Sequence, residues 1–362
     1  MKNNPQPGQL FTADAGGPCC QTGRRRLLQG MMAATAGMML PAKALWPAQS
    51  PNRGLIDVHR HYLAPRLRAQ MAAQGRVVAI FESDTPQKML ADMDAGGVAR
   101  SMLTLMAPPA VVTTTSADRA AIARDANEMG AKLVADNPSR FGFFASLPMP
   151  DVDASLAEIA YAFDTLKADG VQILTSYGNK WLGEPEFAPV YAELNRRKAL
   201  IYTHPLEAAC CNPNVGDMPP TMIEFAADTT RTIGRFVFSG SAARYPDINV
   251  IFSHGGGVLT GVMERFVLQA AMPQMKERLP KGLDHEIRRF YYDTAQAYHA
   301  ATLRGLRTTV PVSQIVFGTD YPYRTAAETY DGMRGTGVFT AAEMRQIGQG
   351  NMQRLLGSRA GR

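Results

Sequence analysis

Beyond residue 50 the chain alternates between short, continuous apolar runs and longer segments with helical periodicity. The apolar runs are not interrupted by a polar residue at every second position, which is typical of parallel strands buried on both faces. We therefore expect eight strands, at residues 55–61, 101–106, 141–147, 170–175, 199–204, 248–254, 290–294 and 314–320.

The segments between these runs place apolar residues three or four positions apart, the spacing of an amphipathic helix. One helix start is marked clearly: Thr85 is a good cap and Pro86 a good first residue. Helices are expected at residues 64–73, 85–94, 116–137, 153–168, 187–197, 221–243, 258–271, 300–307 and 341–356.

This repeated strand–helix order predicts an α/β fold, a (β/α)8 TIM barrel, formed by a single domain over residues 45–362. The alternative is an open, doubly wound sheet. That alternative lacks support because no glycine-rich phosphate-binding fingerprint follows the first strand.

Residues 1–44 read as a leader rather than as part of the fold. The run Arg24-Arg25-Arg26 precedes a mildly apolar stretch at 30–40, and Ala42-Lys43-Ala44 offers a cleavage site. This pattern predicts a twin-arginine export signal and a folded periplasmic protein. The alternative is a basic tail on a cytoplasmic protein whose leader is not used.

The formal charge of +6 does not indicate nucleic-acid binding. Five basic residues and one acidic residue fall within 1–44, so the rest holds 33 basic and 31 acidic residues, close to balance. After position 50 there is no apolar run of eighteen residues, so we expect no membrane anchor after export. Cys210 and Cys211 are adjacent and could be free thiols or a vicinal disulfide.

Histidines gather at the ends of the expected strands. His59 and His61 are two residues apart and therefore share a face of the first strand. His204, His254 and Asp320 end the fifth, sixth and eighth strands. Because the carboxyl ends of barrel strands form one rim, which carries the active site, these five residues predict a metal site.

Each of these residues has a plainer explanation, since a lone histidine at a strand end is often only a hydrogen-bonded core residue. The paired His59 and His61 favour the metal site over that explanation. Of the remaining histidines, His285 lies in a charged helical stretch and is expected to be solvated, while His299 follows the seventh strand and could reach the rim.

Five short motifs surround these positions: Asp57-Val-His59-Arg-His61, Thr203-His204-Pro205, Asp228-Thr-Thr-Arg231, Phe252-Ser-His254-Gly-Gly256 and Phe317-Gly-Thr-Asp320-Tyr-Pro322. They resemble the amidohydrolase superfamily, in particular its branch of aminocarboxymuconate-semialdehyde-decarboxylase-like enzymes, and look most similar to the 6-methylsalicylate decarboxylases of that branch. The resemblance covers about residues 53–357 and implies a TIM barrel of the metal-dependent hydrolase type.

The resemblance implies a role for each matched residue. His59, His61, His204 and Asp320 would bind the metal, and His254 would act beside it as a catalytic proton shuttle together with Asp320. The fourth strand has no lysine of the kind that bridges two ions elsewhere in the superfamily, so one divalent ion is expected. Three histidines and one carboxylate suit Zn²⁺, with Mn²⁺ as the alternative.

Two arginines near the motifs have different expectations. Arg60 lies between the two ligands and, by strand alternation, points away from them. Arg324, just past Asp320, is the candidate to bind a substrate carboxylate, although an arginine of a partner chain could do so instead.

Three functions fit this set of residues. The first is a non-oxidative decarboxylase, a carbon–carbon lyase acting on a small aromatic or unsaturated carboxylic acid such as a hydroxybenzoate. The second is a hydrolase that attacks an ester, lactone or amide with metal-activated water. The third, a binder without catalysis, is disfavoured by the spare proton-transfer residue. By resemblance we also expect a homodimer.

Overall fold

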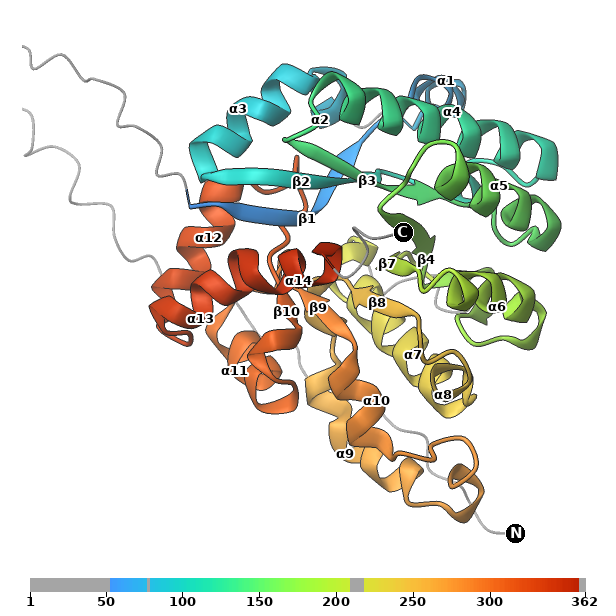
Figure 1. The fold of residues 1–362 in the computed structure, drawn as a ribbon, viewed down its shortest axis with the longest axis vertical. Coiled ribbons are helices and arrows are strands. Elements are labelled where there is room, and N and C mark those ends of the chain that lie inside the picture. Colours follow the sequence, from blue (N-terminus) through green and yellow to red (C-terminus); the bar gives the residue numbers. More distant parts are fainter. Residues whose placement is uncertain (1–52, 77–78, 209–217, 358–362) are drawn as a thin grey trace, which may run out of the picture. The chain divides into compact units, whose positions relative to one another are not determined.

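The computed structural model describes residues 53–76, 79–208 and 218–357, all within one compact unit, Gln49–Arg362. Eight parallel strands pair in the order β1-β2-β3-β4-β7-β8-β9-β10, with helices around them (Figure 1). These strands are β1 Leu55–Tyr62, β2 Val98–Leu105, β3 Phe141–Ser146, β4 Gly170–Leu174, β7 Leu200–His204, β8 Asn249–Phe252, β9 Tyr291–Asp293 and β10 Ile315–Val316.

The sheet curls into a nearly closed barrel, which confirms the predicted (β/α)8 architecture. β1 and the segment that follows β10 meet through backbone hydrogen bonds rather than through a regular ladder. The N–H of Val58 donates to Phe317, the N–H of Asp320 to His59 and the N–H of His61 to Tyr321, each at 2.9 Å. The closing seam therefore runs through the expected metal ligands.

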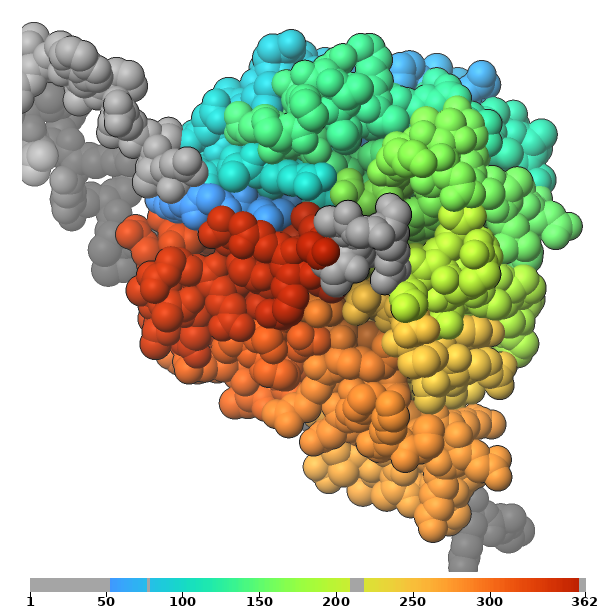
Figure 2. Space-filling model, in the orientation of Figure 1, coloured from blue at the N-terminus to red at the C-terminus, as the bar shows by residue number. Residues whose placement is uncertain are grey.

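The helices cover the outside of this barrel. They are α1 Pro65–Ala73, α2 Ala79–Glu82, α3 Pro86–Gly96, α4 Ser116–Asp136, α5 Val152–Asp164, α6 Ala188–Arg196, α7 Glu224–Phe238, α8 Ser241–Arg244, α9 Leu259–Ala270, α10 Leu283–Arg289, α11 Ala300–Thr309, α12 Ala326–Gly335, α13 Ala341–Arg345 and α14 Asn351–Gly357. In Figure 2 side chains fill the spaces between the ribbons, and the red C-terminal helices lie beside the blue β1, which α14 contacts.

Two apolar clusters hold the fold together. The larger lies between strands and helices. The smaller includes Ile56, Val58, Phe144, Tyr202 and Ile251, together with Met352 and Leu355 of α14. Burying each such side chain contributes about 1.5–3 kcal/mol to the stability of the fold. The apolar residues of the strands therefore stabilise the core of the barrel.

A β-bulge in β1 positions the histidine pair. Asp57 pairs with Ser101 and Arg60 with Leu103, so three steps along β1 face only two along β2. An extra residue in one strand shifts the alternation of its side chains. Val58 therefore belongs to the smaller apolar cluster. The next residue, His59, also contacts that cluster, because its ring lies 5.2 Å from the ring of Tyr202, measured between centroids.

Several expected elements differ from those observed. The helix expected at 221–243 is interrupted after Phe238 because Gly240 takes a left-handed φ of 81°. The helix expected at 341–356 contains a π-helical turn, Gln346–Gly350, between α13 and α14. The short β5–β6 hairpin (Ser176–Tyr177, Lys180–Trp181) and helices α2 and α12 were not predicted.

The last strand is also shorter than expected. β10 ends at Val316, and Asp320 lies four residues beyond it in a left-handed conformation with a φ of 69°. β8 likewise ends at Phe252, before His254. Both residues therefore lie in the turns that follow these strands.

Two sequence predictions fall outside the described part of the chain: the leader at 1–44 and the state of Cys210 and Cys211. Within the described residues, none of the helices has the length and apolarity needed to cross a membrane.

Candidate metal centre

Four of the predicted side chains converge at the rim of the barrel. His59 and His61 of β1, His204 at the end of β7, and Asp320 each offer one ligand atom, and these atoms all lie within 4.8 Å of one another. His59, His61 and Asp320 are almost completely buried. These are the same four residues that were predicted from the sequence as metal ligands.

Hydrogen bonds fix the proton of two imidazole rings on Nδ1. His59 Nδ1 lies 3.0 Å from Asp293 Oδ2, and His204 Nδ1 lies 2.8 Å from the carbonyl oxygen of Pro205. A carboxylate and a carbonyl only accept, so both rings must donate from Nδ1. In the neutral rings, Nε2 is left with a free lone pair.

The third ring is fixed in the same way through a threonine. Thr104 Oγ1 donates its hydrogen to the carbonyl oxygen of Arg60 at 3.2 Å. The same oxygen lies 3.0 Å from His61 Nδ1 and can then only accept from it. In their neutral form, all three ligand histidines thus turn an unprotonated Nε2 towards one point, the arrangement that partners of metal-binding histidines create.

The carboxylate of Asp320 completes the set of four ligand side chains. Asp320 Oδ1 lies 3.1 Å from His59 Nε2 and 3.0 Å from His61 Nε2, yet it is buried and has no hydrogen-bond partner among the described residues. The Nε2 atoms of His59 and His61 are 3.1 Å apart. Two nitrogens bound to one ion at angles of 90–110° lie about 3.0–3.4 Å apart, so the donors fit a single cation.

The pKa shifts of the three histidines indicate that the site favours an added positive charge. Burial lowers the pKa of His59, but the charges of Asp320 and Asp293 outweigh it and raise this pKa to about 10. Burial lowers the pKa of His61 and, together with the other histidines, holds the pKa of His204 well below its usual value. Without a cation the site therefore takes up one proton, on His59.

His254 stands beside the ligands rather than among them. Its Nε2 lies 3.5 Å from Asp320 Oδ2, and its side chain is 14% exposed. Its backbone has a φ of 54°, and a glycine run with positive φ follows, Gly255 to Gly257. A side chain at Gly257 would overlap the carbonyl oxygen of Ala226 in α7, so this turn requires glycine and packs tightly.

The second oxygen of Asp320 has its own partners. Gln296 Nε2 donates to Asp320 Oδ2, the same atom that faces His254. Burial raises the pKa of Asp320, but the charge of His59 and the hydrogen bond from His254 outweigh it and hold this pKa well below its usual value. Asp320 thus presents one oxygen to the ligand cluster and the other to His254 and Gln296.

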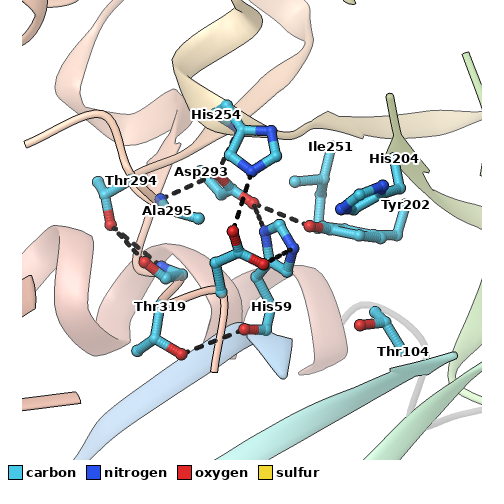
Figure 3. Close-up of polar contacts among 12 residues, drawn as sticks. His59, Thr104, Tyr202, His204, Ile251, His254, Asp293, Thr294, Ala295 and Thr319 are labelled. Carbon is cyan, nitrogen blue, oxygen red and sulfur yellow. Dashed lines mark hydrogen bonds and ion pairs between the residues drawn. The ribbon is translucent and has the colours of Figure 1, made fainter. Parts of the chain in front are cut away.

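Several of these partners were not found from the sequence. Asp293 at the end of β9 is fully buried and contacts both His59 and the backbone of His254 (Figure 3). Its position at the end of a predicted strand was the available signal. Thr104 and Gln296 carried no signal, because threonine in a strand and glutamine in a loop are ordinary.

Arg60 behaves as the strand alternation predicted. It is completely buried, and its guanidinium contacts Asp92 at 2.6 Å, Asp57 at 3.3 Å and Ser101 at 3.0 Å, while it stacks over the Tyr321 ring. Asp57 in turn accepts from the N–H and hydroxyl of Thr319. Arg60 therefore ties β1 to the Asp320 segment from behind.

The other candidates lie apart from the ligand cluster. Arg324 is 47% exposed and lies 3.6 Å from Glu328 on α12. His299 accepts from the N–H of Ala301 at the start of α11, and His285 is exposed on α10. These contacts give Arg324 no part in the cluster, so it stays a sequence-based prediction.

The fourth strand bears on the number of ions. β4 has the sequence GVQIL and contains no lysine. Its polar residue, Gln172, bonds both ways with the backbone of Leu105, at 2.7 and 2.9 Å. This strand thus offers no bridging group for a second ion.

Comparison with known proteins agrees with this geometry. The family model described as amidohydrolase matches residues 56–358. The chain is 33% identical to the decarboxylase macB of Penicillium terrestre and 33% identical to the 6-methylsalicylic acid decarboxylase acuB of Aspergillus aculeatus, in each case over 74% of this chain and 84% of the relative. A crystal structure described as an amidohydrolase II superposes with a TM-score of 0.77 at 27% identity, covering 84% of this chain and 99% of the other.

Proposed function

This chain belongs to the amidohydrolase family, and from that premise we propose that it is a metal-dependent, non-oxidative decarboxylase of a small aromatic acid with a hydroxyl group next to the carboxylate. One observation carries the proposal. Asp320 touches the histidine cluster with one oxygen and His254 with the other, in a chain one third identical to named decarboxylases.

His59, His61, His204 and Asp320 would hold the ion. A bound divalent ion would supply positive charge that stabilises the negative charge developing on the acid. The protein positions the acid's ring over the cluster and keeps water from the buried histidines.

Proton transfer falls to Asp320 and His254. Asp320 would deliver a proton from Oδ2 to the ring carbon that bears the carboxylate. The bond to the carboxylate then breaks, its electron pair restores the aromatic ring, and carbon dioxide leaves. His254 contacts Asp320 Oδ2 and is partly exposed, so it can return a proton from solvent to that oxygen.

The hydrolase alternative would use the same side chains on a different substrate. Fold and ligands do not separate the two reactions. The matched relatives are named as decarboxylases, which favours decarboxylation.

A substrate panel tests the proposal. The metal-loaded protein is incubated with 6-methylsalicylate, other ortho-hydroxybenzoates and para-hydroxybenzoate, while carbon dioxide release is measured. Aryl esters and lactones are offered in parallel. Release only from acids with an ortho hydroxyl supports the proposal, and hydrolysis without any decarboxylation contradicts it.

We propose zinc as the resident ion. Three imidazole nitrogens and one carboxylate oxygen are a common donor set for Zn²⁺, while Mn²⁺ prefers more oxygen ligands. Metal analysis of protein purified without chelators tests this choice, and a stoichiometric manganese content would contradict it.

We propose that the protein works in the periplasm after twin-arginine export. The arginine run at 24–26 and the mildly apolar stretch after it support this proposal. Fractionation of cells that express the full chain tests it, with Arg24, Arg25 and Arg26 replaced by Lys as the comparison. Export that survives this change would contradict it.

We propose a homodimer as well. The support is an apolar surface on α9, where Val267 and Leu268 are 49% and 61% exposed. Light scattering of the purified protein tests this, and a monomer mass would contradict it.

A further inference from the structure

The carboxylate of Asp293 accepts four hydrogen bonds inside the protein. Its Oδ2 accepts from His59 Nδ1 at 3.0 Å and from the hydroxyl of Tyr202 at 3.1 Å. Its Oδ1 accepts from the backbone N–H groups of His254 at 2.7 Å and Ala295 at 3.1 Å. Figure 3 shows Asp293 near His59 and His254, with its contacts to His59 and Tyr202 drawn.

These four hydrogen bonds use the accepting capacity of both oxygens of the Asp293 carboxylate. An ionised carboxylate accepts and does not donate, and here each oxygen serves two donors. The bond to His59 keeps the proton of that ring on Nδ1 and Nε2 free. The bond to His254 supports a backbone with a φ of 54°, which a residue other than glycine seldom adopts.

We propose that Asp293 is a positioning residue that couples the metal centre to the proton-transfer residue His254. It touches neither the ion nor the substrate. Through one buried carboxylate it sets the direction of a metal ligand on β1 and the place of His254 after β8. Its effect on turnover rests on the proposed function, whereas its effect on metal binding does not.

The surroundings leave this group little freedom. Tyr202 is completely buried and stacks on Phe144 with ring centroids 5.5 Å apart, which fixes the position of its hydroxyl. A Cβ at Gly318 would lie 3.1 Å from both Cβ and Cγ of Asp293 and 3.1 Å from Cβ of His59. The pair is thus packed against the backbone of the segment that leads to Asp320.

The direct test is Asp293→Asn, which keeps the size but replaces one acceptor oxygen with an amide that donates. If the amide nitrogen takes the place of Oδ2 it faces the N–H of His59, and if it takes the place of Oδ1 it faces the backbone N–H groups of His254 and Ala295, so either orientation sets a donor against a donor. If the amide faces His59, metal binding weakens. If it faces the His254 N–H, the ion is kept and turnover falls. The expected loss is about 10–100-fold in metal affinity or in kcat.

The matched control is Asp228→Asn. Asp228 is also a completely buried aspartate, and it accepts from Thr175, Ser176 and Trp181, none of which is a metal ligand. Its substitution should leave zinc affinity within about threefold of wild type. Affinity is measured by competition with a chelator, and the visible spectrum of the Co²⁺-loaded protein reports whether the ligand geometry changes.

A second variant covers the case in which Asp293→Asn does not fold. Gly318→Ala presses on Asp293 and His59, whereas Gly305→Ala in α11 makes an equally close contact, 3.0 Å from Thr260, outside the site. We expect weaker zinc binding and an altered Co²⁺ spectrum for Gly318→Ala alone.

The outcomes separate the two proposals. Weaker metal binding in Asp293→Asn or Gly318→Ala, with no turnover even in the wild type, supports the coupling and contradicts the decarboxylase. A wild type that decarboxylates, with a folded Asp293→Asn that matches it in zinc affinity, Co²⁺ spectrum and kcat, overturns the coupling. If Asp293→Asn does not fold, a Gly318→Ala protein with wild-type zinc affinity and spectrum also overturns it.

Discussion

The Nε2 atoms of His59 and His61 lie 3.1 Å apart, and the hydrogen bonds of both rings place the single proton of each on Nδ1. Two lone pairs and the Oδ1 of Asp320 therefore face one another in a buried site. This arrangement is unfavourable unless a positive charge lies between them. The metal centre follows from this proton arrangement as much as from the identity of the residues.

The role of His204 is tested by its removal. His204→Ala deletes one of three nitrogen donors, so we expect the bound metal to fall well below one equivalent and activity to disappear with it. Elemental analysis measures the metal content. His285→Ala, which changes an exposed histidine on α10, is the control. Full metal content in His204→Ala would remove this residue from the ligand set.

His254 should be separable from the ligands. His254→Asn keeps a side chain that tolerates the observed φ of 54° but cannot relay a proton. We expect one equivalent of metal and a kcat lower by about 10²–10⁴-fold. Metal analysis and steady-state kinetics on the same sample check this. A kcat within a few-fold of wild type would exclude His254 from proton transfer.

Metal affinity should rise with pH. In the metal-free protein the pKa of His59 is raised to about 10, so below that pH the ion must displace a proton. The apparent affinity should increase about tenfold for each pH unit between roughly 7 and 9 and level off above the pKa. Chelator competition at several pH values measures it. A constant affinity across this range would show that His59 is not protonated in the metal-free site.

Arg60 is expected to stabilise the packing of β1 against the segment that carries Asp320. Arg60→Leu leaves Asp57 and Asp92 without their buried cation, so we expect the free energy of unfolding to fall by about 3–5 kcal/mol. Urea denaturation of the metal-free protein measures it. Arg334→Leu, at a side chain that is 67% exposed, should change it by less than about 0.5 kcal/mol. Equal stability of both variants would contradict a structural role for Arg60.

The sequence predicted the barrel and the five candidate residues at its strand ends for clear physical reasons, and the family resemblance then separated the four ligands from His254. Buried parallel strands form continuous apolar runs, and polar residues at their ends stand out against them. The shared direction of the strands then brings His59, His61, His204 and Asp320 to one rim. No knowledge of individual contacts was required for this step.

What the sequence did not reveal depends on contacts between distant segments. The proton positions on the ligand rings are set by Asp293 and Thr104, which are 234 and 43 residues away from their histidines in the chain. The bulge in β1 and the early end of β10 are likewise set by pairing with neighbouring strands. Such features leave no periodic signal in the chain itself.

The central claim is that this one-ion centre decarboxylates an ortho-hydroxybenzoate with protein-delivered protons. The most direct measurement is incubation of 6-methylsalicylate in D2O with samples that contain increasing amounts of bound metal. The account predicts carbon dioxide and 3-methylphenol with one deuterium at the carbon that lost the carboxylate, at rates proportional to bound metal and absent in His204→Ala. Turnover that is independent of metal, or hydrolysis of esters and lactones with no carbon dioxide from any hydroxybenzoate, would contradict it.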